Sequence, residues 1–132
     1  MKLLLDTHIA FWAVFARHRL LHGEREVLNR DDVEIIVSAI SIWELRLKWN
    51  SFHLSGDRKG PADPIEALTF FRQLGLRILP LEPELAATPL RDPMPHKDPF
   101  DELLLVHAQE LGVKLLTRDR RLRDHPLAYS AQ

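Results

Sequence analysis

The chain of 132 residues carries a net charge of −1, and 45% of its residues are hydrophobic and 28% charged. These values predict one globular domain over residues 1–132, and the near-neutral charge by itself indicates neither a polyanion nor a membrane surface as partner. The lack of cysteine excludes disulfides and thiolate metal sites and fits a reducing compartment, so we expect a cytoplasmic protein.

The N-terminal half is predicted to form two strands and three helices. Short apolar or β-branched runs indicate strands at 2–6 and 33–39. Helices are expected at 7–16, 20–30 and 42–50. Asp6 or Thr7 is placed to cap the first helix, and Ser41 the third, with Glu44 three positions later as in a capping box. Asp6 and His8 interrupt the apolar N-terminus, which argues against a signal peptide or a membrane span.

The C-terminal half begins with a loop or hairpin at 51–64, which is rich in glycine and proline. Pro64 and Gly75 bracket one helix, and Pro99 and Gly112 bracket another. The remaining expected elements are strands at 76–81 and 113–117, a short helix at 82–90, a loop at 91–99 and a basic tail after the last strand. Strands separated by pairs of helices predict an α/β fold, with a mostly parallel sheet and helices on both faces.

Five acidic residues lie at the ends of these elements: Asp6, Glu44, Asp98, Asp101 and Asp119. Sites in such sheets form beyond the carboxyl ends of the strands, so one rim of the sheet is expected to gather these side chains. Each acid also has an ordinary structural interpretation. Asp6, Asp98 and Asp119 are possible caps, Asp101 suits the positive end of a helix dipole, and Glu44 is a possible capping-box partner.

Converging carboxylates raise one another's pKa, and a divalent cation relieves that repulsion. Oxygen ligands without cysteine favour Mg²⁺ or Mn²⁺. Zinc would need histidines at ligand spacing beside the acids. The one HxxxH pair, His18 and His22, lies in a polar stretch away from the expected acids, and His8 and His96 each lie two residues from an aspartate. His107, on an apolar helix, is expected to be a packing residue.

A magnesium site of this kind predicts chemistry at a phosphate group. The sequence has no phosphate-binding glycine loop, which argues against a nucleoside triphosphatase. The expected site is flanked by basic residues, as a groove for a nucleic-acid backbone requires; these are Arg46, Lys48, Arg118, Arg120 and Arg121. They are equally compatible with solvated surface positions.

The segments LLLDTH, SAISIWELRLK, LGLRILPLEPE and HKDPFDELLLVHAQELGVKLLTRD together resemble a PIN domain, specifically the VapC-type toxins of toxin–antitoxin systems. The resemblance covers residues 2 to about 122. It implies a three-layer α/β/α sandwich with a central, mostly parallel sheet of four to five strands. It also implies an endoribonuclease that cleaves single-stranded RNA with a metal-activated water, leaving a 5′-phosphate and a 3′-hydroxyl. The residues implied to bind Mg²⁺ or Mn²⁺ are Asp6, Glu44, Asp101 and Asp119.

The resemblance assigns further roles by position. Asp98 is an outer metal ligand or only a cap, and Thr7 and Thr117 support the acids through their hydroxyls. His8 departs from the serine or asparagine that is usual at its position. The family implies a homodimer and an antitoxin whose C-terminal segment covers the site. Trp43, Trp49 and Phe52 are the expected antitoxin contacts, whereas Phe70 and Leu74 are expected in the core.

Two other classes of function remain open. A magnesium-dependent phosphatase or phosphotransfer protein has a similar sheet, but the haloacid-dehalogenase type has an aspartate at the position of His8. A catalytically silent binding module of the same fold is the other alternative, and the intact set of acids argues against it.

Overall fold

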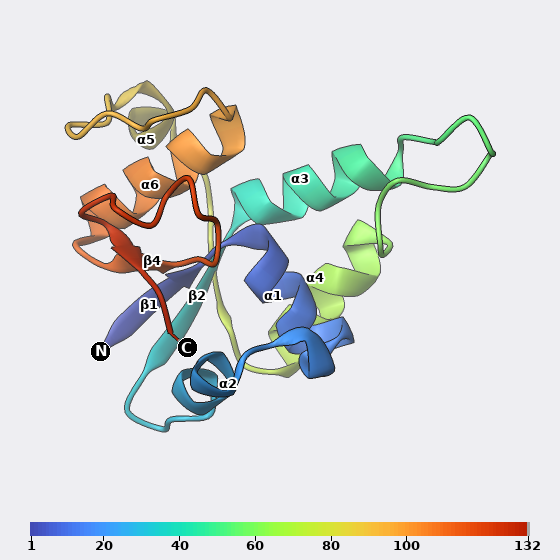
Figure 1. Ribbon diagram of the computed structural model, residues 1–132, viewed down its shortest axis with the longest axis horizontal. Coiled ribbons are helices and arrows are strands. Elements are labelled where there is room, and N and C mark those ends of the chain that lie inside the picture. Colours follow the sequence, from blue (N-terminus) through green and yellow to red (C-terminus); the bar gives the residue numbers. More distant parts are fainter. Residues whose placement is uncertain (132) are drawn as a thin grey trace.

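A parallel β-sheet forms the centre of the molecule. The computed structural model describes residues 1–131, and in this part of the chain five strands pair in the order β3-β2-β1-β4-β5, all parallel (Figure 1). The strands are β1 (Lys2–Leu5), β2 (Glu34–Ser38), β3 (Arg77–Leu79), β4 (Lys114–Leu116) and β5 (Ala128–Tyr129). The first strand is central, so the rim at its carboxyl end lies between segments from both halves of the sequence.

Helices cover both faces of this sheet, as the order of elements predicted (Figure 1). The α-helices are α1 (Thr7–Phe15), α2 (His22–Leu28), α3 (Ala39–Trp49), α4 (Pro64–Gln73), α5 (Pro83–Ala87) and α6 (Pro99–Leu111), with a 3₁₀ turn at Arg17–Arg19. Successive strand residues face opposite sides. Leu3 and Leu5 pack with α1, α2 and α4 in one buried cluster, whereas Leu4 packs with α6 in the other. The expected three-layer sandwich is therefore confirmed.

Local sequence signals set the ends of several helices correctly. Asp63 and Asp98 cap α4 and α6, each followed by a proline at the first helical position. Gly112 ends α6 with a φ of 68°, a left-handed conformation that favours glycine.

The predicted cap of α3 was wrong. Ser38, at the end of β2, caps this helix: its hydroxyl accepts a hydrogen bond from the N–H of Ile40 at 3.0 Å. The helix therefore begins at Ala39, two residues before the predicted cap, and Glu44 lies in its second turn, too far along to form a capping box. Both side chains are buried and bond elsewhere.

The basic tail after β4 is not an unstructured extension. Its last part forms β5, which pairs in parallel with β4. The turn before β5 is fixed by His125, whose Nε2 lies 2.8 Å from the carbonyl oxygen of Asp92 and whose Nδ1 accepts from the N–H of Leu127 at 3.2 Å. Between α3 and α4 the chain projects as a hairpin-like loop closed by a bridge between Phe52 and Arg58 (Figure 1). No helix in the described part of the chain has the length and apolarity that a bilayer crossing demands.

Candidate metal centre

Asp6 lies at the centre of the sheet rim, directly after β1. It caps α1, and its Oδ1 accepts the N–H of Thr7 at 2.7 Å. Its other oxygen accepts a hydrogen bond from the hydroxyl of Thr117, also at 2.7 Å. The side chain is buried, and this burial raises the pKa of Asp6 against the effect of both hydrogen bonds.

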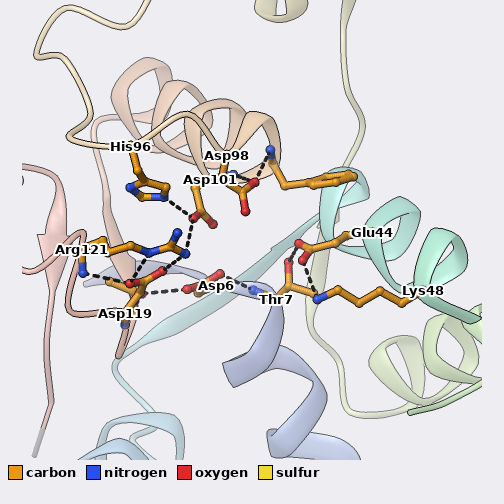
Figure 2. Close-up of polar contacts among 11 residues, drawn as sticks. Asp6, Thr7, Glu44, Lys48, His96, Asp98, Asp101, Asp119 and Arg121 are labelled. Atoms are coloured by element: carbon orange, nitrogen blue, oxygen red, sulfur yellow. Dashed lines mark hydrogen bonds and ion pairs between the residues drawn. The ribbon is translucent and has the colours of Figure 1, made fainter. Parts of the chain in front are cut away.

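Asp101 reaches the same rim from the first turn of α6 (Figure 2). Its Oδ2 lies 2.8 Å from Nε2 of His96. Burial raises its pKa to about 6; the negative charges of Asp6, Asp98 and Asp119 add to the rise, and the hydrogen bond to His96 opposes it. The site therefore holds a carboxyl group that is costly to ionise without a cation beside it.

Asp98 behaves as a helix cap. Its Oδ1 accepts the N–H groups of Phe100 at 2.9 Å and of Asp101 at 3.3 Å. This geometry agrees with the interpretation of Asp98 as a helix cap that precedes a proline.

Asp119 follows β4 and lies across from Asp101 (Figure 2). The guanidinium of Arg121 donates to both its oxygens, at 3.2 Å from Nε and 2.9 Å from Nη2, and also lies 3.9 Å from Asp101. These bonds lower the pKa of Asp119. Thr117 connects this acid to the first: its hydroxyl donates to Asp6 and accepts the N–H of Asp119 at 3.1 Å.

Glu44 approaches from the second turn of α3. Its Oε1 accepts the hydroxyl of Thr7 at 2.7 Å, and its Oε2 lies 2.9 Å from Nζ of Lys48, one turn later (Figure 2). The hydroxyl of Ser41 lies 2.9 Å from that of Thr7. Thr7 therefore links Asp6, through its backbone, to Glu44, through its side chain.

The structure thus brings Asp6, Glu44, Asp101 and Asp119 to one rim from four separate segments (Figure 2). Three basic side chains, Lys48, His96 and Arg121, lie among these acids. Lys48 and Arg121 were predicted beside the site as nucleic-acid contacts, but the direct pairing of the three side chains with the acids was not predicted. In the described part of the chain, the ligand atoms of His96, Asp101 and Asp119 lie within 4.8 Å of one another. Carboxylate oxygens suit a hard divalent cation, and the imidazole beside them can orient one of the carboxylates, so the residues fit a metal site.

The predicted nucleic-acid contacts divide into two groups. Arg46 and Arg120 are exposed, and Lys48 and Arg121 already pair with the acids. Arg118 has a structural position instead: it forms an ion pair with the buried Glu24 and lies over the ring of Trp12, 4.5 Å from its centroid. No local pattern in the sequence indicated that pairing, because its partners are distant along the chain.

The aromatic surface residues also have defined neighbours. Trp43 is 47% exposed and its ring meets that of Phe100 edge-on, 5.4 Å away. Trp49 and Phe52 share the guanidinium of Arg58, at 4.2 Å and 4.8 Å from the two ring centroids. The expectation that Leu74 belongs to the core was wrong, since it is 57% exposed.

Two other expectations concerned packing. Phe70, expected in the core, packs edge-on against Phe15 at 5.3 Å but is still 36% exposed, so the expectation is met only in part. His107 is buried in α6, as expected, and burial lowers its pKa.

Comparison with known proteins identifies the family. The PIN domain model matches residues 3–126, so the chain belongs to the PIN-domain family. The chain is 34% identical over 125 residues to Ribonuclease VapC22 of Mycobacterium tuberculosis, covering 92% of this chain and 90% of the relative. The resemblance inferred from the motifs is therefore confirmed.

Solved structures share the fold. VapBC2 from Rickettsia felis, bound to a DNA fragment from its promoter, aligns with a TM-score of 0.63 at 14% identity and covers 100% of both chains. DNA-bound VapBC from Salmonella typhimurium aligns with a TM-score of 0.58 at 19% identity, covering 98% of this chain and 96% of the other. At these identities the likeness concerns the fold.

Proposed function

We propose that the chain is a metal-dependent endoribonuclease, the toxin of a toxin–antitoxin pair, which hydrolyses phosphodiester bonds of single-stranded RNA. The observation that carries the proposal is the convergence of four carboxylates on the carboxyl rim of a PIN fold, with Asp101 shifted to a pKa of about 6. The relationship to a ribonuclease supports RNA as the substrate.

Asp101, Asp119 and Asp6 would hold the cation, Mg²⁺ or Mn²⁺, and Glu44 would complete the acidic set at the side of α3. When bound, the cation supplies positive charge to the phosphate and lowers the pKa of a water molecule. Asp98 is assigned to capping α6, since its Oδ1 is taken up by backbone N–H groups.

The remaining residues of the site orient these acids. His96, as the Nε2–H tautomer, donates to Asp101 and fixes its carboxylate. Thr117 fixes Asp6 relative to Asp119, and Thr7 fixes Glu44. These bonds hold the ligand oxygens in position before a cation arrives, which lowers the cost of assembling the site.

The cations at the rim have a second role in this proposal. Lys48 and Arg121 neutralise the acids in the metal-free protein and lie where a phosphodiester backbone would approach. Arg46 and Arg120, which are exposed, extend this positive surface.

We also assign the protein two protein partners, a second copy of itself and a cognate antitoxin. The exposed rings of Trp43 and Phe52, with the half-buried Trp49, are the proposed antitoxin contacts. The cytoplasm is the compartment in which such a toxin would meet both its antitoxin and RNA.

Cleavage of a single-stranded oligoribonucleotide by the purified chain tests the proposal. With Mn²⁺ or Mg²⁺ the wild-type protein is expected to cleave, and EDTA is expected to stop the reaction. Asp6→Asn and Asp101→Asn remove a ligand charge with little change in shape, so each is expected to lower the rate by at least about a hundredfold without lowering the melting temperature.

Asp31→Asn is the matched control, because Asp31 is an exposed acid in the turn before β2, at the amino ends of the strands. It is expected to cleave as the wild-type protein does. Undiminished cleavage by both rim variants would contradict the proposal, and hydrolysis of p-nitrophenyl phosphate without cleavage of RNA would favour a phosphatase instead.

A further inference from the structure

Two hollows meet at the side of the acidic rim formed by α1. The smaller, of about 260 Å³, is lined by Asp6 and Asp119 together with His8, Ile9, Trp12 and Arg118. The larger, of about 660 Å³, is also lined by His8 and Trp12 and extends away from the acids. The two hollows therefore adjoin at His8 and Trp12, and we refer to them together as the groove.

The two rings form one edge of this groove. His8 and Trp12 are one turn apart on α1, with ring centroids 5.7 Å apart and planes 33° from parallel. Trp12 packs against the buried cluster under α1, and the guanidinium of Arg118 lies over its ring. Because Glu24 holds Arg118 from a buried position, this wall is rigid, whereas the ring of His8 is exposed.

The larger hollow is basic. Its lining includes Arg19, Lys48, Lys59 and His18, and no aspartate or glutamate of residues 1–131 lines it. Lys59 comes from the loop between α3 and α4, and its N–H donates to the carbonyl oxygen of Ser51 at 2.8 Å. The next residue, Gly60, lies so close to α3 that an added Cβ would overlap the backbone of Trp49, which fixes the loop against the groove.

We propose that this groove binds an unpaired RNA strand, with His8, backed by Trp12, as the platform on which the base next to the cleaved phosphodiester stacks. Grooves that bind single strands combine aromatic faces for the bases with cations for the backbone, and both occur here in the order that a strand leaving the acids would meet them. Lys48 is paired with Glu44, but Arg19 and Lys59 still leave an excess of positive charge, which favours a polyanion over an apolar helix of a protein partner. The inference deepens the proposed ribonuclease function and rests on it.

Binding measured without cleavage tests the platform. In the Asp101→Asn background, fluorescence anisotropy of a 5′-fluorescein-labelled single-stranded octaribonucleotide gives Kd. His8→Ala is expected to weaken binding about tenfold, and His8→Phe, which keeps an aromatic face, to stay within about twofold. Lys59→Ala is expected to weaken binding about threefold and to reduce the slope of log Kd against log salt by about 0.7.

His22→Ala and Lys2→Ala are the matched controls, an exposed histidine on α2 and an exposed lysine at the amino end of β1, and both are expected to bind as the parent does. Equal Kd values for the parent, His8→Ala and Lys59→Ala would overturn the proposal and would favour a protein partner as the occupant of the groove. Loss of binding in His8→Phe as well as His8→Ala, with unchanged melting temperatures, would overturn the stacking role.

Cleavage by the protein that retains Asp101, measured in parallel, separates the two proposals. Cleavage with unchanged Kd values in the groove variants rejects only the platform. A wild-type protein that does not cleave in Mn²⁺ or Mg²⁺ rejects the ribonuclease.

Discussion

The side chains at the rim bring several carboxylates close together, and the repulsion between these carboxylates destabilises the protein unless nearby basic groups offset it. Arg121 offsets part of this repulsion, because its guanidinium donates to both oxygens of Asp119 and lies near Asp101. It is largely exposed, so the contact is easily exchanged with solvent. A bound cation and this guanidinium would therefore compete for the same oxygens.

Arg121→Ala is expected to tighten Mn²⁺ binding by about two- to fivefold, because the exposed guanidinium no longer competes for the oxygens of Asp119. Isothermal titration calorimetry on the metal-free protein measures the change. Arg123→Ala, which removes an exposed arginine two residues away, is the control and is expected to leave the affinity unaltered. Weaker Mn²⁺ binding in Arg121→Ala would instead show that the arginine helps to shape the site.

The raised pKa of Asp101 predicts how stability depends on pH in the metal-free protein. Between the ordinary value of 3.8 and about 6, the folded state binds more protons than the unfolded state. The free energy of unfolding contributed by this group therefore falls as the pH rises through that window and reaches its lowest level above pH 6. Ionised Asp101 destabilises the metal-free fold, and its protonation removes the penalty.

Urea unfolding in EDTA from pH 4.5 to 7.5, compared between wild type and Asp101→Asn, measures this contribution. The variant is expected to be the more stable protein at pH 7.5, with the difference shrinking towards pH 4.5. Parallel pH profiles for the two proteins would mean that Asp101 titrates normally. With saturating Mn²⁺ the order at pH 7.5 is expected to reverse, because only wild type retains the full ligand set.

At the scale of elements, the site depends on how helices begin. Asp6 and Asp98 cap α1 and α6, and Asp101 is in the first turn of α6, so two helix N-termini point at one rim. The helix α3 begins at Ala39 and is capped by Ser38, the last residue of β2. Because α3 begins here, Glu44 lies in its second turn, and its side chain contacts Thr7 and not the N-terminus of its own helix.

Ser38→Ala is expected to destabilise the protein by about 1 kcal/mol, and Ser38→Gly by only a few tenths, because glycine is tolerated at an N-cap and alanine is not. Chemical denaturation measures both. A larger loss for glycine than for alanine would indicate that Ser38 acts mainly as a strand residue of β2 and not as the cap of α3.

The elements that could be predicted from the sequence are those with a local cause. Asp63-Pro64, Asp98-Pro99 and Gly112 mark helix ends through their own backbone preferences, and the structure agrees. The cap of α3 was misplaced because two serines, Ser38 and Ser41, satisfy the same local rule and only the end of β2 decides between them.

The contacts that could not be predicted are those between residues that are far apart in the sequence. The strand β5 has two residues, too short for a periodic signal, and it exists through its pairing with β4. His96 and Arg121 were visible as residues, but their bonds to Asp101 and Asp119 depend on how α6 and the segment after β4 meet. The convergence of the acids on one rim was predictable, since sites in parallel sheets form beyond the carboxyl ends of the strands.

At the scale of the whole molecule, charge is distributed unevenly. The net charge of −1 gave no indication of a polyanionic partner. Nevertheless, basic side chains lie on both sides of the acidic rim. Arg120 and Arg121 lie on one side, near His96. Lys48 and Lys59 lie on the other side, near His8. A nucleic-acid backbone interacts with this local positive charge, which the net charge of the whole chain does not reveal.

The position of β1 between β2 and β4 has a consequence for synthesis of the protein. Thr117, whose hydroxyl donates to Asp6, lies 111 positions further along the chain, and Asp119 follows two residues later. A nascent chain that stops short of them has an incomplete centre, however well its first helices have formed. The topology thus delays assembly of the acidic rim until β4 and Asp119 have been synthesised.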